Sequence, residues 1–175
     1  RRDDLTGPDG DFLPDSVSAQ DVEALARMFA SENPSQGEIL WIEQAWTQLR
    51  ARSRGQSVYD RITAGKGYGN QGGRPVSTDK DASEVHRQVA REVLAGKRPS
   101  SLPGARKYFE PGQQDAVYKQ VQAGKAALAR GEQISERTKL LIKVGYKYDA
   151  DGIRKKWSGE GSRKVGSIGP VEFWT

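Results

Sequence analysis

Apolar residues recur at helical spacing in five separate segments, and this periodicity constrains the fold of the chain more than any other feature. The first segment opens with Ser18, a residue suited to cap a helix, and continues with apolar residues three or four positions apart. It should end near Glu32, because Pro34 disfavours helical backbone in the residue before it. We therefore expect an amphipathic helix over 18–32, with one face directed into a core.

The other four segments show the same pattern, and capping or turn residues bound them. They cover residues 36–52, 81–96, 113–130 and 135–144. The residues expected on their apolar faces include Ile39, Ile42, Trp46, Leu49, Val85, Val89, Val93, Val117, Val121 and Leu128. The end of the chain, residues 165–174, alternates loosely and is rich in β-branched and aromatic residues, which indicates a short strand or extended segment. Its Phe173 and Trp174 are expected to close the domain by packing.

These elements predict a mainly α fold, or α+β with one small extended or β element. An N-terminal arm or linker is expected over 1–17, because this stretch is rich in Asp, Gly and Pro. The remainder, 18–175, is expected to form one domain, with an extra helical and basic region at about 113–164. No internal repeat is present.

The 175-residue chain contains no cysteine and one histidine, which excludes several kinds of site. Thiol nucleophiles, disulfides and thiolate zinc sites are impossible, and a zinc hydrolase needs two or more histidine ligands. A Ser-His-Asp triad would have to use His86, which lies on an expected helix and is interpreted as a surface or half-buried residue. Carboxylate chemistry is the main enzymatic option that remains, and no cofactor or metal is expected.

Glu32 is the main candidate for a catalytic carboxyl, because it ends the first expected helix just before the bend at Pro34. A carboxyl there can project into a cleft and still lean against apolar neighbours. Burial disfavours the ionised form and raises the pKa, so the group keeps its proton near neutral pH. A glutamate at a helix end is more often a solvated surface charge, and physical reasoning alone leaves both interpretations open.

Residues 25–32, 104–111 and 168–174, in this order, resemble three motifs of the germination-type cell wall hydrolases, the spore cortex-lytic group with a lysozyme-like fold. Residues 25–32 are similar to the first motif of that family, in which a Leu-Ala-Arg segment leads to an essential glutamate. Residues 104–111 resemble its Gly-Ala, aromatic pair, Asn-Pro segment, and residues 168–174 resemble its closing Ile-Gly and aromatic pair. The chain departs from the family in Glu110 before the proline, in its central loop, and in the long region 113–164.

The resemblance implies a lysozyme-like helical domain that cleaves the bond between N-acetylmuramic acid and N-acetylglucosamine in peptidoglycan. Glu32 would protonate the glycosidic oxygen and then accept a proton from the C6 hydroxyl or from water. A second carboxylate at the usual spacing would favour hydrolysis. Glu38 and Glu43 are the first two carboxylates after Glu32 in the sequence, and both are interpreted as solvated helix charges. The expectation therefore leans towards a lytic transglycosylase rather than a hydrolase.

Four residues are candidates for contacts with the glycan: Tyr108, and Tyr68, Asn70 and Gln71 in the glycine-rich segment 65–80. An aromatic side chain beside a glycan can stack on a sugar ring or bind through its hydroxyl. A long glycine-rich loop inside a domain is often functional. The alternatives are a core position for Tyr108 and a plain surface loop for 65–80.

The net charge of +5 and the isoelectric point of about 9.5 favour polyanionic partners. Residues 1–35 carry −5 and the remainder +10. Basic and aromatic residues interleaved over 146–164 leave a nucleic-acid or polyanion-binding module as an alternative function, and anionic wall polymers fit the same segment. A third alternative is a catalytically inactive lysozyme-like component of a phage particle or secretion apparatus.

The expected function places the protein outside the cytoplasm, as a secreted, periplasmic or virion-borne domain. No signal peptide begins the chain, and no apolar run approaches the length of a membrane span. The opening Arg1-Arg2-Asp3-Asp4 resembles the interior of a longer protein, which a removed leader or a larger parent chain would explain.

Overall fold

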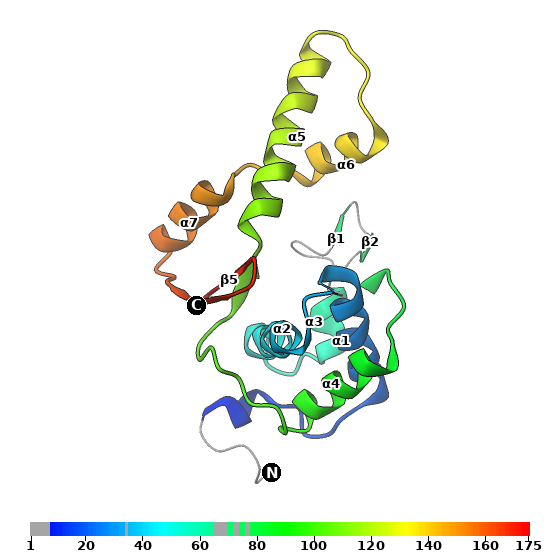
Figure 1. Cartoon of the computed structure of the whole chain (residues 1–175), viewed down its shortest axis with the longest axis vertical. Coiled ribbons are helices and arrows are strands. Elements are labelled where there is room, and N and C mark those ends of the chain that lie inside the picture. The colour runs from blue at the N-terminus through cyan, green and yellow to red at the C-terminus, as the bar shows by residue number, and fades with distance from the viewer. Residues whose placement is uncertain (1–7, 34, 65–69, 72–73, 76–77) are drawn as a thin grey trace.

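The structure, a computed structural model, describes residues 8–33, 35–64, 70–71, 74–75 and 78–175 (Figure 1). The elements in chain order are η1 (Pro8–Phe12), α1 (Ala19–Glu32), α2 (Glu38–Ala51), α3 (Val58–Thr63), β1 (Asn70–Gln71), β2 (Arg74–Pro75), α4 (Glu84–Leu94), β3 (Lys107–Phe109), α5 (Pro111–Ala129), α6 (Glu136–Val144), α7 (Ala150–Gly159), β4 (Lys164–Ile168) and β5 (Val171–Trp174). The expected mainly helical fold with a small β element is confirmed.

The main core lies among α1, α2, α3 and α4, with α2 almost entirely buried. Three of these helices begin at a serine, because the hydroxyl of Ser18, Ser57 or Ser83 accepts a hydrogen bond from a first-turn N–H that has no intrahelical partner. Phe29 of α1 and Trp46 of α2 are fully buried in this core. The polar edge of Trp46 is satisfied, since its indole N–H donates to the carbonyl of Arg98 at 2.8 Å.

A three-stranded antiparallel sheet joins the end of the chain to this helical core. β5 is the central strand, with β3 on one side and β4 on the other. Tyr108 of β3 stands opposite Phe173 of β5, and their ring centroids are 5.5 Å apart. Leu40 of α2 packs against the sheet in a second apolar cluster. Phe173 and Trp174 are buried, which confirms their expected packing role.

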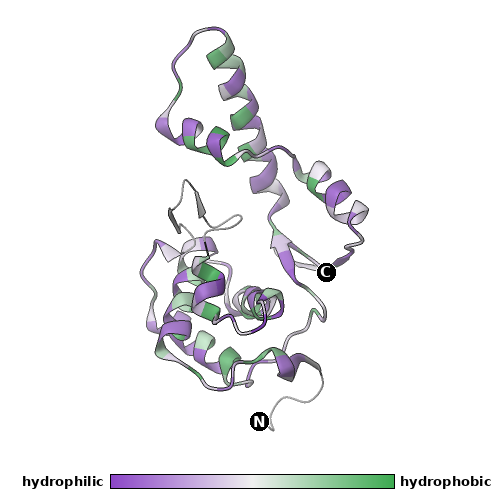
Figure 2. Cartoon of the chain, turned by 180° about the vertical axis from the view of Figure 1, so that it is seen from behind, coloured by the Kyte–Doolittle hydropathy of each residue, from purple (hydrophilic) through white to green (hydrophobic). Residues whose placement is uncertain are grey.

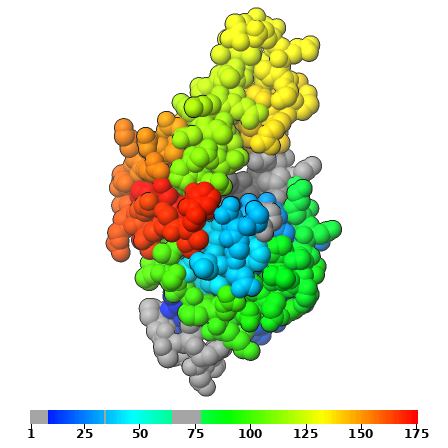
Figure 3. All heavy atoms as spheres, in the orientation of Figure 1, coloured from blue at the N-terminus to red at the C-terminus, as the bar shows by residue number. Residues whose placement is uncertain are grey.

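Helices α5 and α6 form an arm that projects from the rest of the molecule, as Figure 3 shows. The two helices pack through Val117, Val121 and Leu141. Their close approach requires Gly124, because a Cβ at that position would lie only 2.4 Å from Cγ2 of Thr138. The arm is therefore a specifically packed helical hairpin.

Helix α7 returns from the arm to the sheet. Its Trp157 ring meets Phe109 and Trp174 edge-on, with centroids 5.2 and 5.8 Å apart. Figure 2 shows hydrophilic residues interspersed with apolar ones along α5, α6 and α7, as expected for helices with one buried side. The region 113–164 thus contains three helices, of which the sequence predicted the first two.

All five predicted helices are present, and they are α1, α2, α4, α5 and α6. Three predictions about apolar faces are wrong, because Ile39, Val85 and Leu128 have exposed fractions of 68%, 56% and 49%. Each of them lies within two residues of an end of its helix. Periodicity identifies the apolar side of a helix, but it does not say how far a neighbouring element covers that side.

Part of the expected N-terminal arm lies against the core. Phe12 and Leu13 pack on the main cluster, and Asp9 pairs with the buried Arg50 of α2. Residues 1–7 lie outside the described part of the chain. Within that part, no helix combines the length and the apolar character needed to cross a bilayer.

Candidate active site

Glu32 is the last residue of α1, and the helix end is held firmly against α2. The backbone N–H of Asn33 donates to the carbonyl of Phe29 and caps the helix. The carbonyl of Asn33 accepts a hydrogen bond from the Trp41 indole at 2.8 Å, and its side-chain oxygen accepts one from Gln44 at 2.6 Å. Two residues of α2 therefore fix the backbone immediately after Glu32.

The hydroxyl of Tyr108 donates to Oε2 of Glu32 at 2.5 Å, so two residues singled out from the sequence are in direct contact. They lie 76 positions apart, and β3 brings them together. The phenol oxygen is also 4.0 Å from the sulfur of the buried Met28. Since Phe173 backs the Tyr108 ring, the three segments that carry the family resemblance meet at this point.

The electrostatic surroundings favour a protonated Glu32. Burial raises its pKa from the ordinary 4.5 to about 7, and the hydrogen bond from Tyr108 limits the rise. The residue ends a helix, where the helix dipole also disfavours negative charge. Burial raises the pKa of Tyr108 well above its ordinary value, and the nearby Glu32 adds to this. The pair therefore consists of a permanent phenol donor and a carboxyl that can gain or lose a proton near neutral pH.

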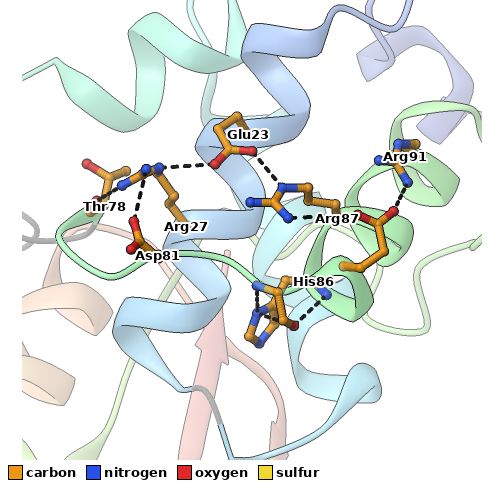
Figure 4. Close-up of polar contacts among 9 residues, drawn as sticks. Glu23, Arg27, Thr78, Asp81, His86, Arg87 and Arg91 are labelled. Atoms are coloured by element: carbon orange, nitrogen blue, oxygen red, sulfur yellow. Dashed lines mark hydrogen bonds and ion pairs between the residues drawn. The ribbon is translucent and has the colours of Figure 1, made fainter.

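The C-terminal end of the glycine-rich segment 65–80 is anchored beside Glu32. The backbone N–H of Lys80 donates to the hydroxyl of Ser31 at 3.0 Å. Arg27 reaches from α1 to the carbonyl of Thr78 and the carboxylate of Asp81, as Figure 4 shows. The Leu-Ala-Arg segment thus contributes to structure: its leucine and alanine lie in the core, and its arginine anchors this connection.

The other predicted sugar contacts are described only in part. Tyr68 lies outside the described residues. Asn70 and Gln71 form β1, which pairs with β2 and lies beside α6, and the description of these two residues is confined to their backbone. Their proposed contacts with a glycan stay predictions.

The interpretation of Glu43 as a solvated charge is wrong, since the residue is 2% exposed. Its carboxylate accepts hydrogen bonds from the hydroxyls of Ser100 and Ser101 and from the Ser101 backbone N–H, at 2.6 to 3.1 Å. These bonds fix the turn that leads to β3. Glu38 is a surface charge, as expected, and pairs with Arg98. The first two carboxylates that follow Glu32 in the sequence are therefore engaged elsewhere.

His86 has a structural role, in agreement with its interpretation as a half-buried helix residue. Its Nδ1 accepts a hydrogen bond from the backbone N–H of Ser83 and completes the cap of α4. Its ring meets Trp41 with centroids 4.6 Å apart. Among the described residues, no group of three or more His, Asp or Glu side chains is arranged to hold a metal ion.

Sequence reasoning missed two polar residues behind the Glu32–Tyr108 pair. Burial raises the pKa of Tyr108, and Gln48 of α2 and the charge of Arg61 of α3 act in the opposite direction. Arg61 donates from Nε to Gln48 Oε1 at 3.1 Å. The available signal was Gln44 and Gln48, two uncharged polar residues one turn apart on a helix rich in apolar residues. An uncharged polar pair inside a buried helix indicates specific hydrogen bonds.

No protein-family model matches the chain, and neither the curated proteins nor the solved structures contain a match. The function proposed below therefore depends on the geometry of the site and on the resemblance of its three segments to motifs of the cell wall hydrolases.

The raised pKa of Glu32 predicts a pH-dependent stability. The folded state holds this proton more tightly than the unfolded state, so Glu32 lowers the free energy of unfolding as pH rises from about 4.5 to about 7. After allowance for residual solvent, the loss should be about 2 kcal/mol. We expect urea unfolding to show Glu32→Gln about as stable as wild type at pH 4.5 and more stable at pH 8. An equal difference at both pH values would contradict the raised pKa.

Proposed function

We propose that this protein is a peptidoglycan glycosidase that cleaves the bond between N-acetylmuramic acid and N-acetylglucosamine, with Glu32 as its general acid and base. The contact between Glu32 and Tyr108 is the observation that carries the proposal. A carboxyl that is half protonated near neutral pH can both give and accept a proton, and one positioned group with that pKa suffices for both steps.

In the first step, the proton on Glu32 moves to the glycosidic oxygen as the bond to the muramic acid C1 breaks through an oxocarbenium-like state. Glu32 is left as a carboxylate, which the Tyr108 hydroxyl stabilises through its hydrogen bond. In the second step, the carboxylate accepts a proton from the nucleophile that attacks C1. Glu32 then returns to its starting state.

The surroundings of Glu32 favour the muramic acid C6 hydroxyl as that nucleophile, which gives a 1,6-anhydro product. Hydrolysis with two carboxylates requires a second acidic group free to act at the sugar. Glu43 is buried under the bonds from Ser100 and Ser101, and Glu38 pairs with Arg98 at the surface. We therefore favour a lytic transglycosylase over a hydrolase, acting outside the cytoplasm where its substrate lies.

Digestion of purified peptidoglycan by the wild-type protein tests this function. Mass analysis of the released muropeptides should find new 1,6-anhydromuramic ends, which are lighter than reducing ends by one water. Reducing ends alone would support the glycosidase and contradict the transglycosylase mechanism. Peptide-bond products, or no products at all, would contradict the proposed function.

A polyanion-binding role for the C-terminal part is supported by a separate observation. Residues 113–175 contain twelve Lys and Arg against seven Asp and Glu, whereas residues 1–112 contain sixteen of each, so the whole positive excess lies in the later part. Five exposed lysines there make no ion pair with any described residue: Lys119, Lys125, Lys143, Lys147 and Lys155. We propose that they bind the phosphates of anionic wall polymers.

Reversing charge in this part should weaken attachment to cell walls. We expect the triple change Lys143→Glu, Lys147→Glu and Lys155→Glu to lower binding to walls that retain their phosphate polymers by tenfold or more, on the order expected for three lost phosphate contacts at low salt. Sedimentation with walls over a salt series measures this. Lys97→Glu, an exposed lysine outside the region, is the matched control. Equal binding by the triple variant and the control would contradict the proposal that these lysines bind wall polymers.

A further inference from the structure

Two side chains of α2 bind the residue that follows Glu32. The amide Nε2 of Gln44 donates to the side-chain oxygen of Asn33 at 2.6 Å, and the indole N–H of Trp41 donates to the Asn33 carbonyl at 2.8 Å. This carbonyl lies beyond the last residue of α1, where the helix itself provides no N–H for it. Asn33 is thus held at its side chain and at its backbone, and both donors belong to one helix.

Both donors are fixed in the core. The Trp41 ring stacks on Phe29 of α1, with centroids 5.9 Å apart. Gln44 is fully buried, and it lies one turn after Leu40, which belongs to the apolar cluster that contacts Tyr108. Residues one turn apart share a helix face, so the face of α2 that carries Gln44 is directed at the sheet that contains Tyr108.

The Gln44 amide is a poor choice for stability alone. Its Oε1 is buried and has no hydrogen-bond partner among the described residues. A buried amide oxygen without such a bond costs free energy, whereas an apolar side chain of similar shape would avoid that cost. A polar residue at such a position indicates a role for its N–H₂ group, which is the group that binds Asn33.

We propose that Gln44 and Trp41 are positioning residues that act through Asn33. They hold the last turn of α1, which would otherwise fray as helix ends do, so that the Glu32 carboxyl stays in contact with Tyr108. This inference rests on the proposed function for its catalytic meaning. The position of the carboxyl itself can be measured without any substrate.

The test is a double-mutant cycle read by ¹³C NMR titration of the Glu32 carboxyl in Gln44→Met, Asn33→Ala and the double variant. Gln44→Met should lower the Glu32 pKa by about one unit, because a freed helix end admits solvent and weakens the effect of burial. In the Asn33→Ala background, the same replacement should have little further effect. Trp41→Phe, which removes the other donor and keeps an aromatic ring, should also lower the pKa.

Gln114→Met is the matched control. Gln114 of α5 is 3% exposed and donates from Nε2 to the Tyr148 carbonyl at 2.7 Å, far along the chain from Glu32. Its replacement should lower the free energy of unfolding in urea and leave the Glu32 pKa unchanged. Gln44→Met should be at least as stable as wild type, because it removes the unpaired oxygen and water can replace its bond to the partly exposed Asn33. During peptidoglycan cleavage by Gln44→Met, the basic limb of the pH–rate profile should move to lower pH with the Glu32 pKa.

Equal falls in both backgrounds would mean that Gln44 acts on Glu32 without Asn33, and this result would overturn the inference. An unchanged Glu32 pKa in either Gln44→Met or Trp41→Phe would overturn it as well. Neither result depends on activity, so both are distinct from a failure of the proposed function. That failure would appear as unchanged peptidoglycan in the wild-type digestion, with the titration still showing the coupling.

Discussion

Replacement of Glu32 by glutamine is expected to abolish glycan cleavage, with a rate at least about a thousandfold below wild type. The amide has nearly the shape of the carboxyl, so packing at the end of α1 should be preserved. It cannot protonate a glycosidic oxygen, and it cannot accept a proton from the attacking hydroxyl. Because one residue performs both steps in the proposed mechanism, its loss removes both contributions together. The measurement is the release of muropeptides from purified peptidoglycan.

Two controls make this result specific. Glu38→Gln changes an exposed carboxylate at the start of α2 and should leave the rate within about twofold of wild type. The stability of Glu32→Gln at pH 8 should equal or exceed that of wild type, which separates lost chemistry from lost folding. Cleavage by Glu32→Gln at the wild-type rate would contradict the catalytic role of Glu32.

Replacement of Arg50 by alanine is expected to destabilise the fold by about 3 kcal/mol, the typical cost of breaking a buried ion pair. Arg50 is 2% exposed, and its guanidinium donates to both carboxylate oxygens of Asp9 at 3.2 Å and to the Ala105 carbonyl at 3.2 Å. The same group lies over the Trp46 ring, 5.6 Å from its centroid. Its loss would leave a carbonyl and a carboxylate unpaired where α2, η1 and the segment before β3 meet.

Urea unfolding at pH 7 measures this effect. Arg54→Ala, which removes an exposed arginine in the turn after α2, is the matched control and should change the free energy of unfolding by less than about 0.5 kcal/mol. Asp9→Asn should lower the free energy of unfolding by less than Arg50→Ala does, because 24% of the Asp9 side chain is exposed. Equal stability of Arg50→Ala and Arg54→Ala would mean that the hydrogen bonds of Arg50 with Asp9 and Ala105 do not stabilise the fold.

Local sequence patterns predicted helices well, because a helix is decided by residues three or four positions apart. Ser18 accepts a hydrogen bond from Asp21, and Asn33 follows the last helical residue, as the pattern indicated. Tertiary burial was predicted less well. Ile39 matches the apolar spacing of α2 and yet is exposed, whereas Glu43 is charged and yet buried. The partners of Glu43 lie 57 and 58 positions away, so no local pattern could reveal them.

The sequence by itself placed Glu32 at the C-terminal end of an amphipathic helix, where a carboxyl is disfavoured as an anion. It also singled out Tyr108, but it left open whether that residue packs in the core or faces a sugar. Only the tertiary structure decided that the Tyr108 hydroxyl meets Glu32. The physical reason is that helix ends follow from local backbone preferences, whereas hydrogen bonds between distant segments exist only after the sheet and the helices have packed.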